Sequence, residues 1–82
     1  MILSPKSIAI LKILAPGEEL YGIQIMERSK GVLGRGTIYV TLAYLEEQLL
    51  VSSRQETVAA VGQIPRRLYR ITDVGKLNAE VA

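Results

Sequence analysis

The chain has 82 residues and a net charge of +2, and it contains neither cysteine nor histidine. A chain this short buries only about 60% of its unfolded surface, so we expect a single domain over residues 1–82 with a modest core, which favours self-association. Disulfides and thiolate metal sites are excluded, and the usual general base and the commonest zinc ligand are missing, so the composition predicts no enzyme, no metal and no cofactor.

A first helix is predicted to begin at Ser4-Pro5 and to be stopped by Pro16-Gly17. Serine caps helices and proline suits the first helical position. Residues 8–15 are apolar, but Lys12 interrupts them and they are too few to span a bilayer. Since no basic segment precedes them and no signal-peptidase pattern follows, the sequence predicts a cytoplasmic protein without a membrane segment.

A second helix is expected over residues 18–29. It starts with two glutamates and ends with basic residues, and both features suit the helix dipole. Gly22 inside it costs about 1 kcal/mol relative to alanine. Such a glycine usually permits the close approach of a neighbouring helix.

The third predicted helix, residues 36–49, carries two opposite stripes. Steps of 100° per residue place four aliphatic residues on one narrow face, namely Ile38, Leu42, Leu45 and Leu49. The opposite face holds Val40, Ala43, Tyr44 and Glu47. A plain amphipathic core helix gives the same pattern, so geometry alone does not distinguish it from a DNA-recognition helix.

Two strands and a last helix complete the predicted fold. Residues 50–57 are typical of a strand, residues 58–64 of a loop or strand tip, and residues 66–71 alternate as a second strand. Thr72 can cap a last helix that continues to residue 82. The order α-α-α-β-β-α indicates a mainly α domain with a small β-hairpin, which is a winged helix-turn-helix.

Basic residues concentrate at two points although the net charge is small. One cluster ends with Arg35 before the third helix, and the other contains Arg66 and Arg67 in the hairpin. A phosphate-facing surface requires such local asymmetry, but ordinary solvated surface, or edge charges that discourage strand pairing, would explain it as well. Because adjacent strand residues face opposite ways, we expect one of Arg66 and Arg67 to make the main contact.

Together these features predict contact with double-stranded DNA. A recognition helix buries one stripe and offers the other to the major groove. Val40 or Ala43 would pack on a thymine methyl group, and threonine and tyrosine hydroxyls would reach phosphates or base edges, although part-burial of Tyr39 is the stronger expectation for that residue. The candidate DNA-binding residues are Arg35, Thr37, Tyr39, Val40, Ala43, Tyr44, Arg54, Arg66 and Arg67.

Four segments resemble the PadR-type transcriptional regulators. Residues 20–25 (LYGIQI) resemble that family's LYGYEI segment, and residues 36–42 (GTIYVTL) resemble its GTLYPTL motif. Residues 45–51 (LEEQLLV) are similar to LEEKGLV, and residues 69–76 (YRITDVGK) to YRLTEEGR. The resemblance covers nearly the whole chain in order. It implies a dimeric winged-helix repressor of a partly palindromic operator, with residues 37–43 at the DNA.

The chain departs from the family pattern at several points. Val40 replaces the usual proline, and Leu49 stands where a C-capping glycine is common, so the third helix is expected to run on. Residues 58–61 are unusually apolar for a wing tip, which indicates a longer hairpin or a partner contact. Only about ten residues follow Thr72, where relatives continue into dimer-forming helices. Either a homodimer forms through the first and last helices, or the chain is a fragment or a stand-alone variant, and a small-molecule effector is not expected.

The function that we predict is that of a sequence-specific DNA-binding transcriptional regulator, a repressor. Its recognition helix, residues 36–49, would lie in the major groove with the wing, residues 55–66, beside it. The alternative is a winged-helix protein-interaction module without DNA binding, which the modest charge, Glu46-Glu47 and the apolar tip favour. An enzyme is the third and least favoured hypothesis.

Overall fold

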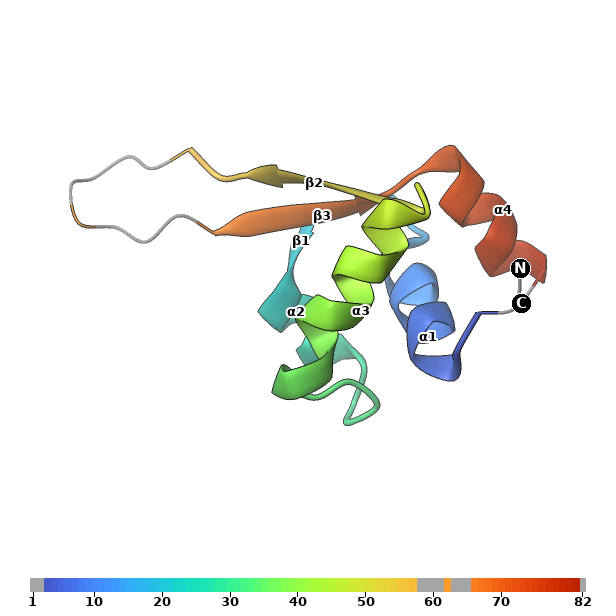
Figure 1. Ribbon diagram of the computed structural model, residues 1–82, viewed down its shortest axis with the longest axis horizontal. Helices are drawn as coiled ribbons and strands as arrows, with labels where there is room; N and C mark the ends of the chain where they lie inside the picture. The colour runs from blue at the N-terminus through green and yellow to red at the C-terminus, as the bar shows by residue number, and fades with distance from the viewer. Residues whose placement is uncertain (1–2, 58–61, 63–65, 82) are drawn as a thin grey trace.

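The computed structural model describes residues 3–57, 62 and 66–81, which form four helices and a three-stranded antiparallel sheet (Figure 1). The elements in chain order are α1 (Pro5–Leu14), β1 (Leu20–Tyr21), α2 (Gly22–Arg28), α3 (Arg35–Glu47), β2 (Val51–Gln55), β3 (Arg67–Ile71) and α4 (Asp73–Val81). Figure 1 shows the hairpin of β2 and β3 running out from the group of helices, with α4 beside α1. The predicted mainly helical winged-helix architecture is confirmed.

Strand β1 corrects the prediction of a helix from residue 18. Leu20 and Tyr21 pair with Tyr69 and Leu68 of β3, which gives the strand order β1-β3-β2. Sheet pairing therefore keeps this segment extended, and Tyr21 is the N-cap of α2. The Tyr21 backbone N–H donates to the Gln24 side chain at 2.8 Å, which satisfies one of the free donors at the helix start.

Apolar residues from helices and strands alike form one core. The three predicted inward residues of α3 that lie within the helix, Ile38, Leu42 and Leu45, are buried, as predicted. Around them lie Ile10, Leu11 and Leu14 of α1, Leu20 of β1, Ile25 of α2, and Tyr69 and Ile71 of β3. The start of α1 is also as predicted, because the Ser4 hydroxyl accepts from the Ser7 backbone N–H at 3.2 Å.

The end of α3 differs from the prediction. The helix stops at Glu47 instead of running on, and Leu49 takes a left-handed backbone conformation with φ of 64°. The Leu50 N–H then donates to the Leu45 carbonyl at 3.0 Å, a bond that typically closes such a helix end. Leu49 is consequently 72% exposed, and Leu50 enters the core instead. The prediction that placed Leu49 on the inward stripe was wrong, because the helix ends at Glu47 before reaching Leu49.

Helix α4 is fixed to the end of α3 by Thr72. The Thr72 hydroxyl accepts from the Gly75 N–H at 3.0 Å and donates to the Leu49 carbonyl at 2.7 Å, so its predicted capping role is confirmed. Gly75 is buried against the backbone of Leu50. The apolar wing tip predicted over residues 58–61 lies outside the described residues.

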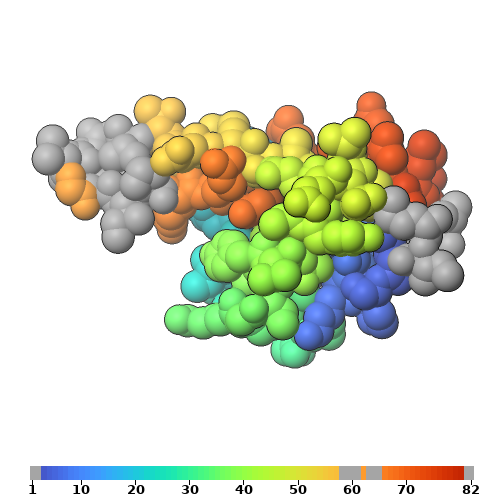
Figure 2. All heavy atoms as spheres, viewed as in Figure 1, coloured from blue at the N-terminus to red at the C-terminus, as the bar shows by residue number. Residues whose placement is uncertain are grey.

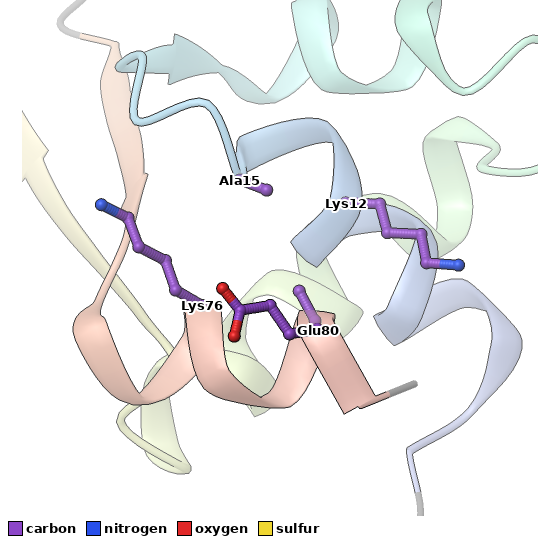
Figure 3. A pocket seen from close by; sticks show the side chains of 5 residues that line it. Lys12, Ala15, Lys76 and Glu80 are labelled. Atoms are coloured by element: carbon purple, nitrogen blue, oxygen red, sulfur yellow. The ribbon is translucent and has the colours of Figure 1, made fainter.

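A shallow hollow of about 210 Å³ separates parts of α1 and α4 (Figure 3). Its lining residues are Lys12, Ala15, Lys76, Ala79 and Glu80. The side chains of Lys12 and Lys76 extend away from each other in Figure 3, so the hollow presents no convergent charge. Within the described part of the chain, no helix has the length and apolarity needed to cross a membrane.

Candidate nucleic-acid interface

The outward face of α3 is open along much of its length. Tyr39, Val40 and Tyr44 are 55%, 72% and 42% exposed, and Ala43 is exposed between them. Figure 2 shows the atoms of α3, in green, lying uncovered on the front of the molecule next to those of α1, in blue. The placement of these side chains opposite the buried stripe agrees with the periodicity of the sequence.

Tyr39 lies on the flank of this face and packs against α2. A Cβ atom added to Gly22 would lie 2.6 Å from Cε1 and 2.9 Å from the hydroxyl oxygen of Tyr39. The close approach expected at Gly22 is therefore made by a side chain of α3. With half its surface exposed, Tyr39 is less buried than expected, and the missing side chain at Gly22 makes room for its ring.

The start of α3 presents a cation and hydroxyl groups. Arg35 is the first residue of the helix and is exposed. The Thr37 hydroxyl donates to the Gly34 carbonyl at 3.3 Å and accepts from the Gly34 N–H at 3.4 Å, and the Thr41 hydroxyl donates to the Thr37 carbonyl at 2.8 Å. Both threonine hydroxyls are thus engaged within the protein.

A second hollow adjoins this face. It has a volume of about 410 Å³ and is lined by Ser4 and Ser7 at the start of α1 and by Val40, Thr41 and Tyr44 of α3. The sequence indicated Ser4 only as a helix cap. Its position beside the outward face of α3 depends on how α1 packs on α3, which no local pattern of residues records.

One face of the sheet lies toward α3 and carries Arg67. Arg67 donates from Nη1 to the Ser53 hydroxyl at 3.0 Å, and Ser53 in turn donates to the Glu46 carboxylate of α3. Tyr69 shares this face, and burial raises the pKa of its phenol. Arg67 therefore extends the surface of α3 onto the hairpin.

The opposite face of the sheet carries Arg54 and Arg66, and each is paired with a carboxylate. Arg54 makes a two-point contact with Glu19, with Nε–Oε2 and Nη2–Oε1 distances of 2.8 and 3.0 Å. This hydrogen-bonded pairing lowers the pKa of the Glu19 carboxyl and raises the pKa of Arg54. Arg66 Nε lies 3.5 Å from the Glu56 carboxylate.

Tyr21 joins this second pair and connects the two outer strands. Its hydroxyl donates to Glu56 at 2.5 Å, which raises the pKa of Tyr21, and the guanidinium carbon of Arg66 lies 4.1 Å from the centre of its ring. The carboxylates of Glu19 and Glu56 were not predicted from the sequence as partners of these arginines. Their partners are 35 and 10 residues away, so only the strand register brings them together.

The nine predicted site residues therefore separate into two groups. Seven lie on α3 or on the sheet face toward it, namely Arg35, Thr37, Tyr39, Val40, Ala43, Tyr44 and Arg67. Arg54 and Arg66 lie on the far sheet face beside Glu19 and Glu56. The alternation predicted for Arg66 and Arg67 is confirmed, and it places Arg67 on the side of α3.

Comparison with known proteins agrees with this fold. The model of the transcriptional regulator PadR-like family matches residues 10–81, whereas no curated protein matches the chain. A PadR family transcription regulator from Clostridium difficile R20291 is 27% identical, with a TM-score of 0.82 over 95% of this chain and 82% of that one. A PadR-like transcriptional regulator from Bacillus cereus is 26% identical, with a TM-score of 0.71 over 92% and 74% of the two chains.

Bacillus subtilis PadR, solved in complex with operator DNA, has the same fold. It is 24% identical, with a TM-score of 0.83, and the match covers 98% of this chain and 47% of that one. The chain thus spans about half the length of that regulator. Because the family model covers the helices of the interface, the hairpin and α4, the chain belongs to the PadR-like family of transcriptional regulators.

Proposed function

We propose that this chain is a sequence-specific DNA-binding repressor whose helix α3 enters the major groove. The observation that carries the proposal is the open outward face of α3, where Val40 is 72% exposed on a helix whose other side is fully buried. A helix held this way can insert one face between the DNA backbones without disturbing the core. The complex of Bacillus subtilis PadR with operator DNA supports the same use of the fold.

Phosphate contacts would come first from the two arginines on the α3 side. Arg35 stands at the start of the helix, and Arg67 stands on the hairpin face that continues the helix surface. Arg54 and Arg66 would have to exchange Glu19 and Glu56 for phosphate before contributing. We therefore expect them to contribute less than Arg67, although all four were candidates from the sequence.

A homodimer would present two copies of α3 to a partly palindromic operator. On the surface of α4, Val74 and Leu77 are exposed, and α4 packs beside α1. Paired apolar faces of this kind would join two copies while leaving both recognition faces free. Repression would then follow from occupancy of the operator by the dimer.

The test is a fluorescence-anisotropy titration with a selected DNA sequence and with random DNA at several salt concentrations. Removing one phosphate contact lowers the salt slope by about 0.9. We expect this loss for Arg67→Ala and a smaller one for Arg66→Ala, while Lys12→Ala, in the hollow between α1 and α4, serves as the matched loss of one cation. Tyr44→Ala should alter sequence preference directly, and Thr37→Ala should alter it by removing the hydroxyl that holds Gly34 at the start of α3. If neither arginine nor either hydroxyl change moves the binding curve, the proposed interface is wrong.

A further inference from the structure

The open face of α3 has an unusual chemical composition for a base-reading surface. Between Gly36 and Glu47 the sequence contains no arginine, lysine, asparagine, glutamine or histidine. Guanine is usually read by arginine or lysine, and adenine by asparagine or glutamine, through two hydrogen bonds to the base edge. This stretch of helix cannot make either contact.

Several of the remaining polar side chains of this stretch are already hydrogen-bonded within the protein. Those of Thr37 and Thr41 are held by backbone groups of the same helix. The carboxylate of Glu46 is hydrogen-bonded to Ser53 of the hairpin, and Glu47 is the last residue of α3, away from the centre of the face. What projects from the centre of the face is the isopropyl group of Val40, with the methyl group of Ala43 next to it and a tyrosine on each flank.

We infer that Val40 reads the 5-methyl group of a thymine in the major groove, so that the base pair facing the centre of α3 is A·T with its thymine toward the helix. This inference rests on the proposed function and deepens it by naming the base that the site selects. Thymine is the base whose major-groove edge carries a methyl group, and an apolar side chain recognises it by excluding water. The short side chain of Ala43 leaves room for the DNA to approach Val40.

The experiment begins with sequences selected from a randomised duplex library by the purified full chain. Each thymine of the selected site is then replaced singly by deoxyuridine, which removes the methyl group and keeps the base pair. We expect one thymine in each half-site to lose about fourfold in affinity, the value for one buried methyl group. In Val40→Ala, that position should become insensitive to the replacement.

Leu49→Ala is the matched control, because Leu49 is also 72% exposed but follows the end of α3. It should keep the full thymine-to-uracil ratio whatever its overall affinity. The ratio is measured within one variant, so a general loss of binding does not imitate the effect, and thermal melting confirms that Val40→Ala is folded.

Three results would distinguish the possible errors. If no uracil replacement weakens wild-type binding by more than about 1.5-fold, well short of one buried methyl group, the inference is overturned and the site is read through DNA shape or tyrosine hydroxyls. If the sensitivity persists unchanged in Val40→Ala, the methyl group is read by another residue and the assignment to Val40 is wrong. If no sequence is selected at all, the proposed function itself fails.

Discussion

Gly75→Ala tests the packing of α4 on the end of α3. A Cβ atom at this position would lie 2.1 Å from the Leu50 carbonyl oxygen and 2.7 Å from Cγ1 of Ile71. The Ile71 side chain can give way, but the Leu50 carbonyl cannot move freely, because it accepts a hydrogen bond from the Thr72 N–H at 3.1 Å. The alanine therefore forces α4 away from the turn that α3 makes at its end.

The expected loss follows from two opposing effects. Overpacking a well-filled site costs about 1–3 kcal/mol, and a contact this short against backbone belongs at the upper end of that range. Alanine is better than glycine within a helix by about 1 kcal/mol. The net loss of unfolding free energy is then about 2 kcal/mol, or a melting temperature lower by about 8–16 °C for a domain of this size.

Thermal and urea unfolding followed by circular dichroism would measure this loss. Gly36→Ala is the matched control, since Gly36 also lies in the first turn of a helix but has no atom within 4 Å of an added Cβ. That variant should be as stable as the wild type or slightly more stable. If Gly75→Ala melts with or above Gly36→Ala, the close approach of α4 to Leu50 is not present in solution and the reasoning is refuted.

Three other substitutions give sharp expectations. In Gly22→Ala, the three atoms nearest to the added Cβ all belong to the half-exposed ring of Tyr39. Because this ring can shift, we expect little change in melting temperature but altered DNA binding, and a large drop in stability would show that the ring cannot move. Glu19→Gln removes a carboxylate whose pKa is lowered by Arg54. In urea titrations the wild type should therefore have the higher unfolding free energy above pH 4.5, and the difference from the variant should fade as the pH falls through the lowered pKa. A difference that stays constant with pH would exclude the ion pair as its cause. Glu56→Gln frees the arginine paired with it across the hairpin, so random-sequence DNA binding at low salt should strengthen and its salt slope rise by up to about 0.9, and an unchanged slope would mean that this arginine does not reach the DNA.

Features that depend on neighbouring residues were predictable from the sequence. The start of α1 follows from a serine cap and a proline at the first helical position, and the buried stripe of α3 follows from aliphatic residues spaced at the helical period. Strand β1 was missed because two residues carry no periodicity, and its partner in β3 lies nearly 50 residues away. Pairing of this kind is set by tertiary contacts, which override local helix preference.

The end of α3 shows a different limit. Leucine disfavours a left-handed backbone by about 1–2 kcal/mol, so the residue type at position 49 does not predict the left-handed conformation that Leu49 adopts. The reason lies in the residues that follow. Leu50 and Val51 are both buried, and the reversal of the chain at Leu49 directs both of them into the core. Burial of these two residues offsets the local cost.

The charged side chains of the hairpin show what the alternation of residues along a strand predicts and what it does not. Arg67, Tyr69 and Ile71 alternate with the other residues of β3, so they share one face of the sheet. Because Tyr69 and Ile71 are apolar and must face the core, Arg67 must lie on the side of α3, just beyond the edge of the core. This assignment was available from the sequence alone. The carboxylates that neutralise the arginines on the other face could not be predicted in this way. Glu19 lies just before β1 and Glu56 just after β2, and only the register of the folded sheet places Glu56 opposite Arg66. A net charge of +2 therefore understates how the molecule is polarised. Arg54 and Arg66 are paired with carboxylates on the far sheet face, whereas Arg35 and Arg67 lie on the α3 side and make no salt bridge within the described part of the chain.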